Sequence, residues 1–202
     1  MTILPQRLKL VYNIYLMPTD KSNSDEEIIA LYKDGDSEVF KCLIDKYSPP
    51  LYNFTARLTD EHNAPDIVQD TFIKAWKKIR AFDPSKASFK TWIFAIARNT
   101  AIDFLRKKKS LNFSELEEDG GSFSEQIPDE NLIPAEALQK LEDSQLLNKL
   151  LEKLPLQYKT VLVLHYQEDM TFDEIGEILD KPPNTVKSHH HRAIAELRKL
   201  LA

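Results

Sequence analysis

The sequence predicts an all-α protein made of two small helical domains joined by a flexible acidic linker. Apolar residues recur at steps of three and four in both halves of the chain, which is the spacing of helices with one buried face. Two capping-box patterns, Ser24 with Glu27 and Thr171 with Glu174, stand directly before apolar runs. Strand signals are missing, because there is no Asn-Gly or Asp-Gly hairpin and no long alternating run rich in Val and Thr.

Charge along the chain indicates where the domains divide. The 202 residues carry 27 Lys and Arg against 32 Asp and Glu, a net charge of −5. Residues 111–134 hold seven acidic residues, no Lys or Arg and the pair Gly120-Gly121, without a sustained apolar period. Repulsion among the carboxylates keeps such a segment extended, so we interpret it as a linker. The predicted division is an N-terminal extension at 1–21, a first domain at 22–110 and a second domain at 135–202.

In the first domain we expect helices from Ser24 onward. Pro49-Pro50 should break a helix, because proline has no N–H to donate. Cys42 lies in an apolar-periodic helix and is expected to be a buried thiol. A loop at 81–88 then leads into a long helix, whose spaced residues are Phe89, Trp92, Ile93, Ile96, Thr100 and Phe104.

This long helix belongs to the first of two basic segments. Residues 80–109 hold eight basic and two acidic residues, a net charge of +6, and end in Arg106-Lys107-Lys108-Lys109. Cations at a helix C-terminus suit the macrodipole, which is a purely structural account of that cluster. Aromatic rings interleaved with basic residues, as around Phe82, also hold unstacked bases. The residues alone leave both interpretations open.

In the second domain Pro155 should break a helix, and residues 171–200 read as a helix-turn-helix. A capped amphipathic helix at 171–179, with Gly176 on its packing side, is followed by a short turn and a second helix that opens with Pro183. Residues 181–202 are the second basic segment, with five basic and one acidic residue. An ordinary helical hairpin is the alternative, and the net positive charge in an acidic protein favours DNA binding.

Composition and motifs exclude several classes of protein. A single cysteine rules out an intramolecular disulfide and with it a disulfide-stapled secreted fold. No run approaches the roughly 18–20 apolar residues that span a membrane, and no signal peptide is evident. We therefore expect a soluble cytoplasmic protein without membrane insertion. The sequence has no Gly-rich phosphate loop, no His-Glu-x-x-His and no nucleophile elbow, so we expect no enzyme and no cofactor.

Three adjacent histidines raise the question of a metal site. Consecutive residues of a helix point about 100° apart, so His189, His190 and His191 cannot converge on one ion. No cysteine lies near them. We therefore predict no metal site.

Two sets of motifs stand in order along the chain. The first set is Asp66-Ile67-Val68-Gln69-Asp70-Thr71-Phe72, Trp76, the run from Phe89 to Asn99, Ile102-Asp103 and Leu105-Arg106. The second set is Leu154-Pro155, Val161-Leu162, Thr171 to Ile175, Thr185 to Ser188 and His191-Arg192-Ala193. Together they resemble the motifs of bacterial RNA polymerase sigma factors of the extracytoplasmic-function (ECF) type, over about residues 24–110 and 135–200.

The resemblance implies a dissociable subunit that binds core RNA polymerase and directs it to promoter DNA. It implies polymerase binding by Asp66, Gln69 and Asp70, reading of the −10 element by the first domain, and reading of the −35 element by the helix-turn-helix. The family commonly has an anti-sigma factor, which no residue here confirms. The residues expected to contact DNA are Phe82, Lys86, Lys90, Arg98, Asn99, Arg106, Lys107, Lys187, Ser188, His189, His191 and Arg192. The alternative function is a stand-alone helix-turn-helix regulator of duplex operators, which would not need the motifs at 66–106.

The second helix departs from the family pattern at two positions. The family usually has Arg where His189 stands and an apolar residue where His190 stands. The stripe formed by Val186, His190, Ala193 and Leu197 predicts that His190 packs inward. An inward imidazole should be mostly neutral at pH 7, because burial disfavours its charged form.

Overall fold

The computed structural model describes residues 24–109 and 145–201, and all regular structure within them is helical. The predicted all-α class is confirmed. The predicted linker at 111–134 and the extension at 1–21 lie outside the described residues. The elements are α2 (Asp25–Lys33), η1 (Ser37–Val39), α3 (Phe40–Leu58), α4 (Ala64–Lys78), η2 (Ile79–Ala81), α5 (Phe89–Lys109), α8 (Gln145–Glu152), α9 (Leu156–Tyr166), α10 (Phe172–Leu179) and α11 (Pro183–Leu201).

Both predicted capping boxes are confirmed. The Ser24 hydroxyl accepts from the Glu27 N–H at 3.3 Å, and the Glu27 carboxylate accepts from the Ser24 N–H at 3.1 Å. Thr171 and Glu174 make the same pair of bonds at the start of α10, at 3.3 and 2.8 Å. Each box satisfies backbone donors that a helix leaves without an internal partner, so these two helix starts are encoded locally.

The predicted break at Pro49-Pro50 is wrong, because both prolines lie inside α3. The helix continues on account of its buried stripe, which consists of Leu43, Tyr47, Leu51, Phe54 and Leu58. A proline costs about 3 kcal/mol in a helix interior, whereas each buried large apolar side chain contributes about 1.5–3 kcal/mol. Five such side chains outweigh two prolines. Pro155, by contrast, directly precedes α9, as predicted.

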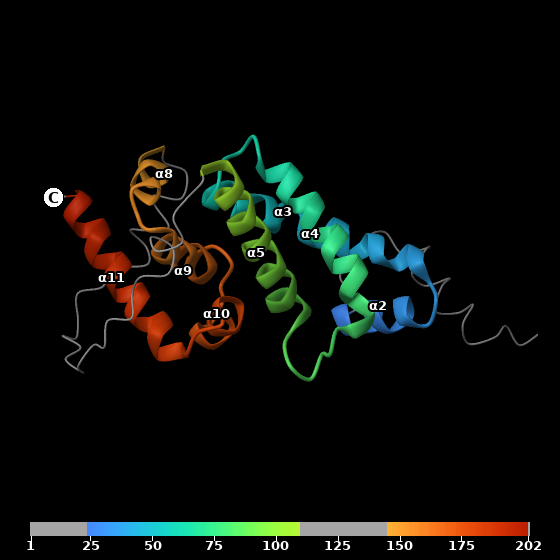
Figure 1. Ribbon diagram of the computed structural model, residues 1–202. Helices are drawn as coiled ribbons and strands as arrows, with labels where there is room; N and C mark the ends of the chain where they lie inside the picture. The colour runs from blue at the N-terminus through green and yellow to red at the C-terminus, as the bar shows by residue number, and fades with distance from the viewer. Residues whose placement is uncertain (1–23, 110–144, 202) are drawn as a thin grey trace, which may run out of the picture.

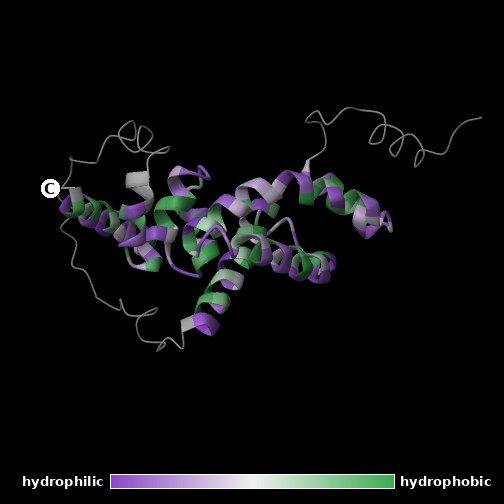
Figure 2. Cartoon of the chain, turned by 90° about the horizontal axis from the view of Figure 1, so that it is seen from above, coloured by the Kyte–Doolittle hydropathy of each residue, from purple (hydrophilic) through white to green (hydrophobic). Residues whose placement is uncertain are grey.

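Helix α5 occupies the centre of the molecule (Figure 1). It lies between α3 and α4 of the first domain and α10 of the second domain, and it packs against all three. One apolar cluster runs through both domains, from Ile28 in α2 to Val186 in α11. Most helices carry hydrophobic and hydrophilic residues along opposite sides of the same ribbon (Figure 2). No local pattern in the sequence indicates this interface between the domains.

The second domain has a further apolar cluster of its own, in which α8, α9 and α11 meet. In its helix-turn-helix, α10 ends at Leu179, and its C-cap Asp180 is left-handed, with a φ of 54°. A Cβ on Gly176 would lie 2.8 Å from the Lys181 carbonyl oxygen, so this position requires glycine for the turn to approach α10. Among the described residues no helix is long and apolar enough to cross a membrane.

Candidate functional site

The exposed face of α4 carries the residues predicted to bind a protein partner. Asp66, Gln69 and Asp70 are all exposed, whereas Ile67 and Phe72 on the same helix are buried. The three polar residues lie within four positions of one another, so they share one side of the helix. The predicted grouping of these side chains on an exposed face is therefore present.

Two large apolar residues extend this face. Ile73 is 42% exposed and Trp76 is 53% exposed. The helix buries a narrow stripe against α3 and α5, and Ile73 falls outside it. The spacing 66, 69, 73, 76 is a helical stripe that could have indicated this earlier.

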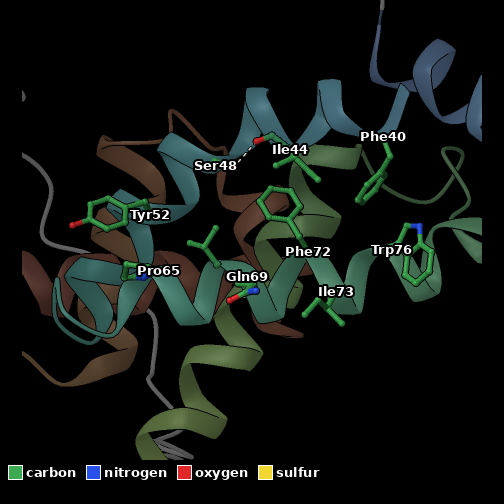
Figure 3. Close-up of a pocket in the computed structure, with 10 residues that line it drawn as sticks. Phe40, Ile44, Ser48, Tyr52, Pro65, Gln69, Phe72, Ile73 and Trp76 are labelled. Carbon is green, nitrogen blue, oxygen red and sulfur yellow. Dashed lines mark hydrogen bonds between the residues drawn. The ribbon is translucent and has the colours of Figure 1, made fainter. Parts of the chain in front are cut away.

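An apolar groove lies beside this face, between α3 and α4 (Figure 3). Its volume is about 610 Å³. Phe40, Ile44 and Tyr52 line it from α3, while Gln69 and Trp76 line it from α4. Exposed apolar surface beside polar residues is typical of a protein–protein contact site.

The loop between η2 and α5 is shaped by local hydrogen bonds. The Asp83 carboxylate accepts from the Ser85 N–H at 3.1 Å and from the Ser85 hydroxyl at 2.7 Å. These bonds hold the pKa of the Asp83 carboxyl below its ordinary value. At the other end, the Ser88 hydroxyl accepts from the Thr91 N–H at 3.1 Å and caps α5. Lys33 of α2 donates to the Phe82 carbonyl at 2.7 Å and fixes the start of the loop.

Phe82 does not lie on the surface. It is 5% exposed and packs against Phe89 and Trp92, with ring centroids 5.8 and 5.1 Å away. This burial contradicts the prediction that Phe82 contacts a base. The ring closes the apolar core beneath the loop. The position of Phe82 at the start of a basic segment does not indicate that its side chain is buried.

The remaining predicted DNA contacts of the first domain lie on α5 and its preceding loop. Asn99 is exposed, and its Oδ1 accepts from the Arg98 guanidinium at 3.0 Å. Arg98 is half-buried, and burial lowers its pKa, with the nearby charge of Arg106 adding to the effect. Lys86 and Lys107 are exposed. Lys90 is half-buried and donates to the Glu168 carbonyl of the second domain at 2.5 Å.

Helix α11 presents the predicted basic side of the helix-turn-helix. Lys187 and His191 are exposed, and Arg192 is half-buried. The Ser188 hydroxyl donates to the Asn184 carbonyl one turn earlier, at 3.0 Å. These four side chains lie off the buried stripe, as predicted from their spacing.

His190 packs inward, as predicted. Its ring lies among those of His165, Tyr166 and Phe172, with centroids 5.3 to 5.6 Å apart. Burial lowers its pKa to about 4, and the neighbouring His165 and His191 act in the same direction. The imidazole is therefore neutral at pH 7.

His189 is also buried, which contradicts the prediction that it contacts DNA. It is 2% exposed, and its ring meets that of Tyr158 edge-on at 5.7 Å. The reason is that α11 packs against both α9 and α10, so its buried side is wider than one stripe. A helix between two neighbours can bury two adjacent residues, although a single apolar stripe would include only one of them.

Two other expectations concern metal binding and the cysteine. Within residues 24–109 and 145–201 no three His, Cys, Asp or Glu side chains are gathered as metal ligands. Cys42 is exposed, so the expectation of a buried thiol is wrong. It neighbours the buried Leu43 on α3 but faces outward.

Comparison with known proteins matches both halves of the chain. The family described as Sigma-70 region 2 matches residues 43–111, and the family described as Sigma-70, region 4 matches residues 144–197. The chain is 38% identical over 173 residues to ECF RNA polymerase sigma factor SigW of Bacillus subtilis (strain 168), which covers 84% of this chain and 92% of that protein. It is 30% identical over 178 residues to ECF RNA polymerase sigma-E factor of Escherichia coli (strain K12), covering 84% and 90%.

The fold is similar to a solved complex of the sigma factor RpoE with the anti-sigma factor NepR from Bartonella quintana. The TM-score is 0.60 at 27% sequence identity, and the match covers 80% of this chain and 96% of that one. Both matched families, in this order along one helical chain, are those of a factor of promoter recognition. The chain belongs to the ECF RNA polymerase sigma factors.

Proposed function

We propose that this sigma factor binds core RNA polymerase through the exposed face of α4. The observation that carries the proposal is the stripe of exposed acidic, amide and apolar side chains at Asp66, Gln69, Asp70, Ile73 and Trp76. Apolar side chains supply buried area in such a contact, and flanking charges steer and orient the partner. By resemblance to the family, the surface bound is the clamp coiled coil of the largest polymerase subunit.

Charge reversal tests this contact. The double variant Asp66→Lys, Asp70→Lys should lose at least about 90% of its capture by immobilised core polymerase, because two attractive charges become repulsive. Trp76→Ala should weaken capture separately, through lost apolar contact. Glu177→Lys, an exposed acidic position on α10, is the matched control and should bind normally. Capture of the double variant equal to that of the wild type would refute the assignment.

The same proposal assigns the −10 element to the first domain. Asn99 is exposed and can offer donors and an acceptor to a base edge. Basic side chains around it can meet the phosphates of a melted strand. The residues proposed for this contact are Lys86, Lys90, Arg98, Asn99, Arg106 and Lys107.

The −35 element is assigned to α11. A helix that follows a tight turn and carries basic residues on its outer side fits the major groove of duplex DNA. The residues proposed for this contact are Lys187, Ser188, His191 and Arg192. The alternative of a stand-alone operator-binding regulator has no support in the comparisons, because region 2 is matched as well as region 4.

We further propose that an anti-sigma factor holds the chain inactive. A relative of similar fold has been solved with its anti-sigma factor, NepR. The groove between α3 and α4 is a surface that such a partner and polymerase would share. An anti-sigma factor identified by two-hybrid screening should compete with core polymerase for the wild-type chain. A partner that binds simultaneously with polymerase would overturn this arrangement.

A further inference from the structure

The two domains are joined by a reciprocal pair of lysine contacts. Lys90, on α5 of the first domain, donates from Nζ to the Glu168 carbonyl at 2.5 Å, two residues beyond the end of α9. Lys159, on α9 of the second domain, donates from Nζ to the Leu58 carbonyl at 3.5 Å. Leu58 is the last residue of α3. Lys159 thus places an ammonium group at the carboxyl end of α3, and Lys90 places one just beyond the carboxyl end of α9.

This geometry suits the charges involved. The last carbonyls of a helix have no internal partner and carry the negative end of its macrodipole, so a cation there is stabilising. Lys159 is only 8% exposed and Glu168 is 7% exposed. Burying an ammonium group is costly unless it is hydrogen-bonded, so these contacts favour one particular arrangement of the domains.

An apolar interface accompanies the lysine pair. Helix α10 packs along α5, and helix α9 packs against α3. Phe89 and Phe94 of α5 belong to the same buried cluster as Met170 and Ile175 of the second domain. Apolar burial supplies the attraction between the domains, and the two lysines fix their register.

Closure of the domains involves residues of the proposed −10 surface. Lys90 has its ammonium group on the Glu168 carbonyl, and Arg98 is half-buried and lies near enough to Asp180, the C-cap of α10, for that charge to act on its pKa. The ammonium group of Lys90 cannot lie in this contact and on a DNA phosphate at the same time. Asn99 and Lys107 stay exposed, so the surface is covered in part.

We infer that the free sigma factor closes on itself through the Lys90–Glu168 and Lys159–Leu58 contacts, and that this closed state competes with binding of the −10 strand. DNA binding by the first domain then requires the two domains to separate. The inference rests on the proposed role of Lys90 and Arg98 in DNA binding. The closure itself is a separate, measurable property of the free protein.

Lys159 allows closure to be tested without touching the proposed DNA or polymerase surfaces. Lys159→Met keeps the length and apolar stem of the side chain but removes the ammonium group. Lys153→Met, an exposed lysine of the same domain, is the matched control. Circular dichroism and thermal unfolding would verify that each variant is folded.

The distance between the domains is the first readout. Cys42 is exposed on α3 and is the one cysteine of the chain, and Ala195→Cys adds a second label site on the exposed side of α11. Energy transfer between dyes at these sites should be high in the parent and in Lys153→Met. It should fall in Lys159→Met and, independently, in Lys90→Met. Unchanged transfer in both folded lysine variants would overturn the inference.

DNA affinity is the second readout. Fluorescein-labelled single-stranded DNA of random sequence should bind the free Lys159→Met variant about threefold to tenfold more tightly than the parent, by anisotropy. If Lys159→Met shows reduced energy transfer but binds DNA with the same affinity as the parent, closure does not compete with DNA binding and that part of the inference is wrong. In the parent, addition of core polymerase and promoter DNA should lower the transfer. If no holoenzyme forms, the proposed function is wrong. The energy transfer measured in the free factor would still show whether the two domains are closed.

Discussion

The hydroxyl of Tyr166 and the Nε2 atom of His190 lie 2.9 Å apart inside the second domain. This contact joins the end of α9 to the middle of α11, and the His190 ring also meets the stacked pair His165 and Phe172. It gives the buried imidazole a polar partner in its neutral form. The helix-turn-helix therefore contains a histidine whose protonation works against its packing.

We predict that His190 makes the folded chain sensitive to acid. Its pKa is about 4 in the folded chain and near 6.5 when unfolded, so the unfolded chain takes up the proton first as the pH falls. The stabilisation is complete above about pH 6.5 and is lost toward pH 4, by about 2–3 kcal/mol. His190→Leu should flatten this dependence in urea unfolding across that range. His62→Leu, an exposed position in the first domain, should keep the parent slope.

Glu168 should produce the opposite dependence. Burial raises its pKa to about 7, only partly offset by Lys90, so its protonated form is favoured in the folded chain. This contribution is fully present below about pH 4.5 and is lost as the pH rises through 7. Glu168→Gln should therefore raise the free energy of unfolding by about 2 kcal/mol at pH 8 and change it little at pH 4.5. Glu177→Gln, which is exposed, should have no effect at either pH; a gain at both pH values would contradict the prediction for Glu168.

Asn99→Ala should impair promoter opening more than duplex binding. The exposed amide can make paired hydrogen bonds to a base edge, which are worth about 1–3 kcal/mol. We expect open complexes of the holoenzyme to fall by about tenfold, measured as permanganate reactivity of promoter thymines. Asn53→Ala, an exposed asparagine on α3, should behave as the parent. Unchanged thymine reactivity in Asn99→Ala would remove this residue from the −10 contact.

Lys187→Ala should weaken −35 binding through a lost phosphate contact. Each such contact releases about one counterion, so the slope of log affinity against log salt should become shallower by about one. Measurement uses holoenzyme on promoter DNA across a salt series. A slope identical to that of the parent would place Lys187 outside the interface.

His189→Arg should destabilise the second domain instead of strengthening its DNA contact. The position is 2% exposed, so the variant places a guanidinium group in an apolar core. We expect a loss of at least about 2 kcal/mol in urea unfolding. Ala195→Arg places the same charge on the exposed side of α11 and should be tolerated. Full stability of His189→Arg together with tighter DNA binding would mean that α11 is rotated from the position described here.

Local signals predicted local structure well. Ser24, Thr171 and Pro183 each mark a helix start in the structure, because capping and proline placement depend on residues within one turn. The inward position of His190 followed from spacing alone. His190 lies on the apolar stripe of α11, and such a stripe correctly identifies the residues that a helix buries on one side.

Burial on a second side could not be predicted from spacing. His189 and Phe82 are buried because α11 and the η2–α5 loop each meet more than one neighbour. Ile73 and Cys42 are exposed because their helices bury narrower faces than apolar periodicity indicated. The lysine contacts join residues 78 and 101 positions apart, and no local pattern encodes such pairs.

The close approach of the turn to Gly176 has a consequence for how the factor fits promoters whose −10 and −35 elements are separated by spacers of different length. A Cβ at this position would lie 2.8 Å from the Lys181 carbonyl oxygen, so the turn packs directly on α10 and resists a change in the angle between α10 and α11. The packing therefore opposes a tilt of the reading helix toward a displaced −35 element. Tolerance to the spacer between the two promoter elements must then come from hinge motion between the domains, and a factor held in its closed state would have none.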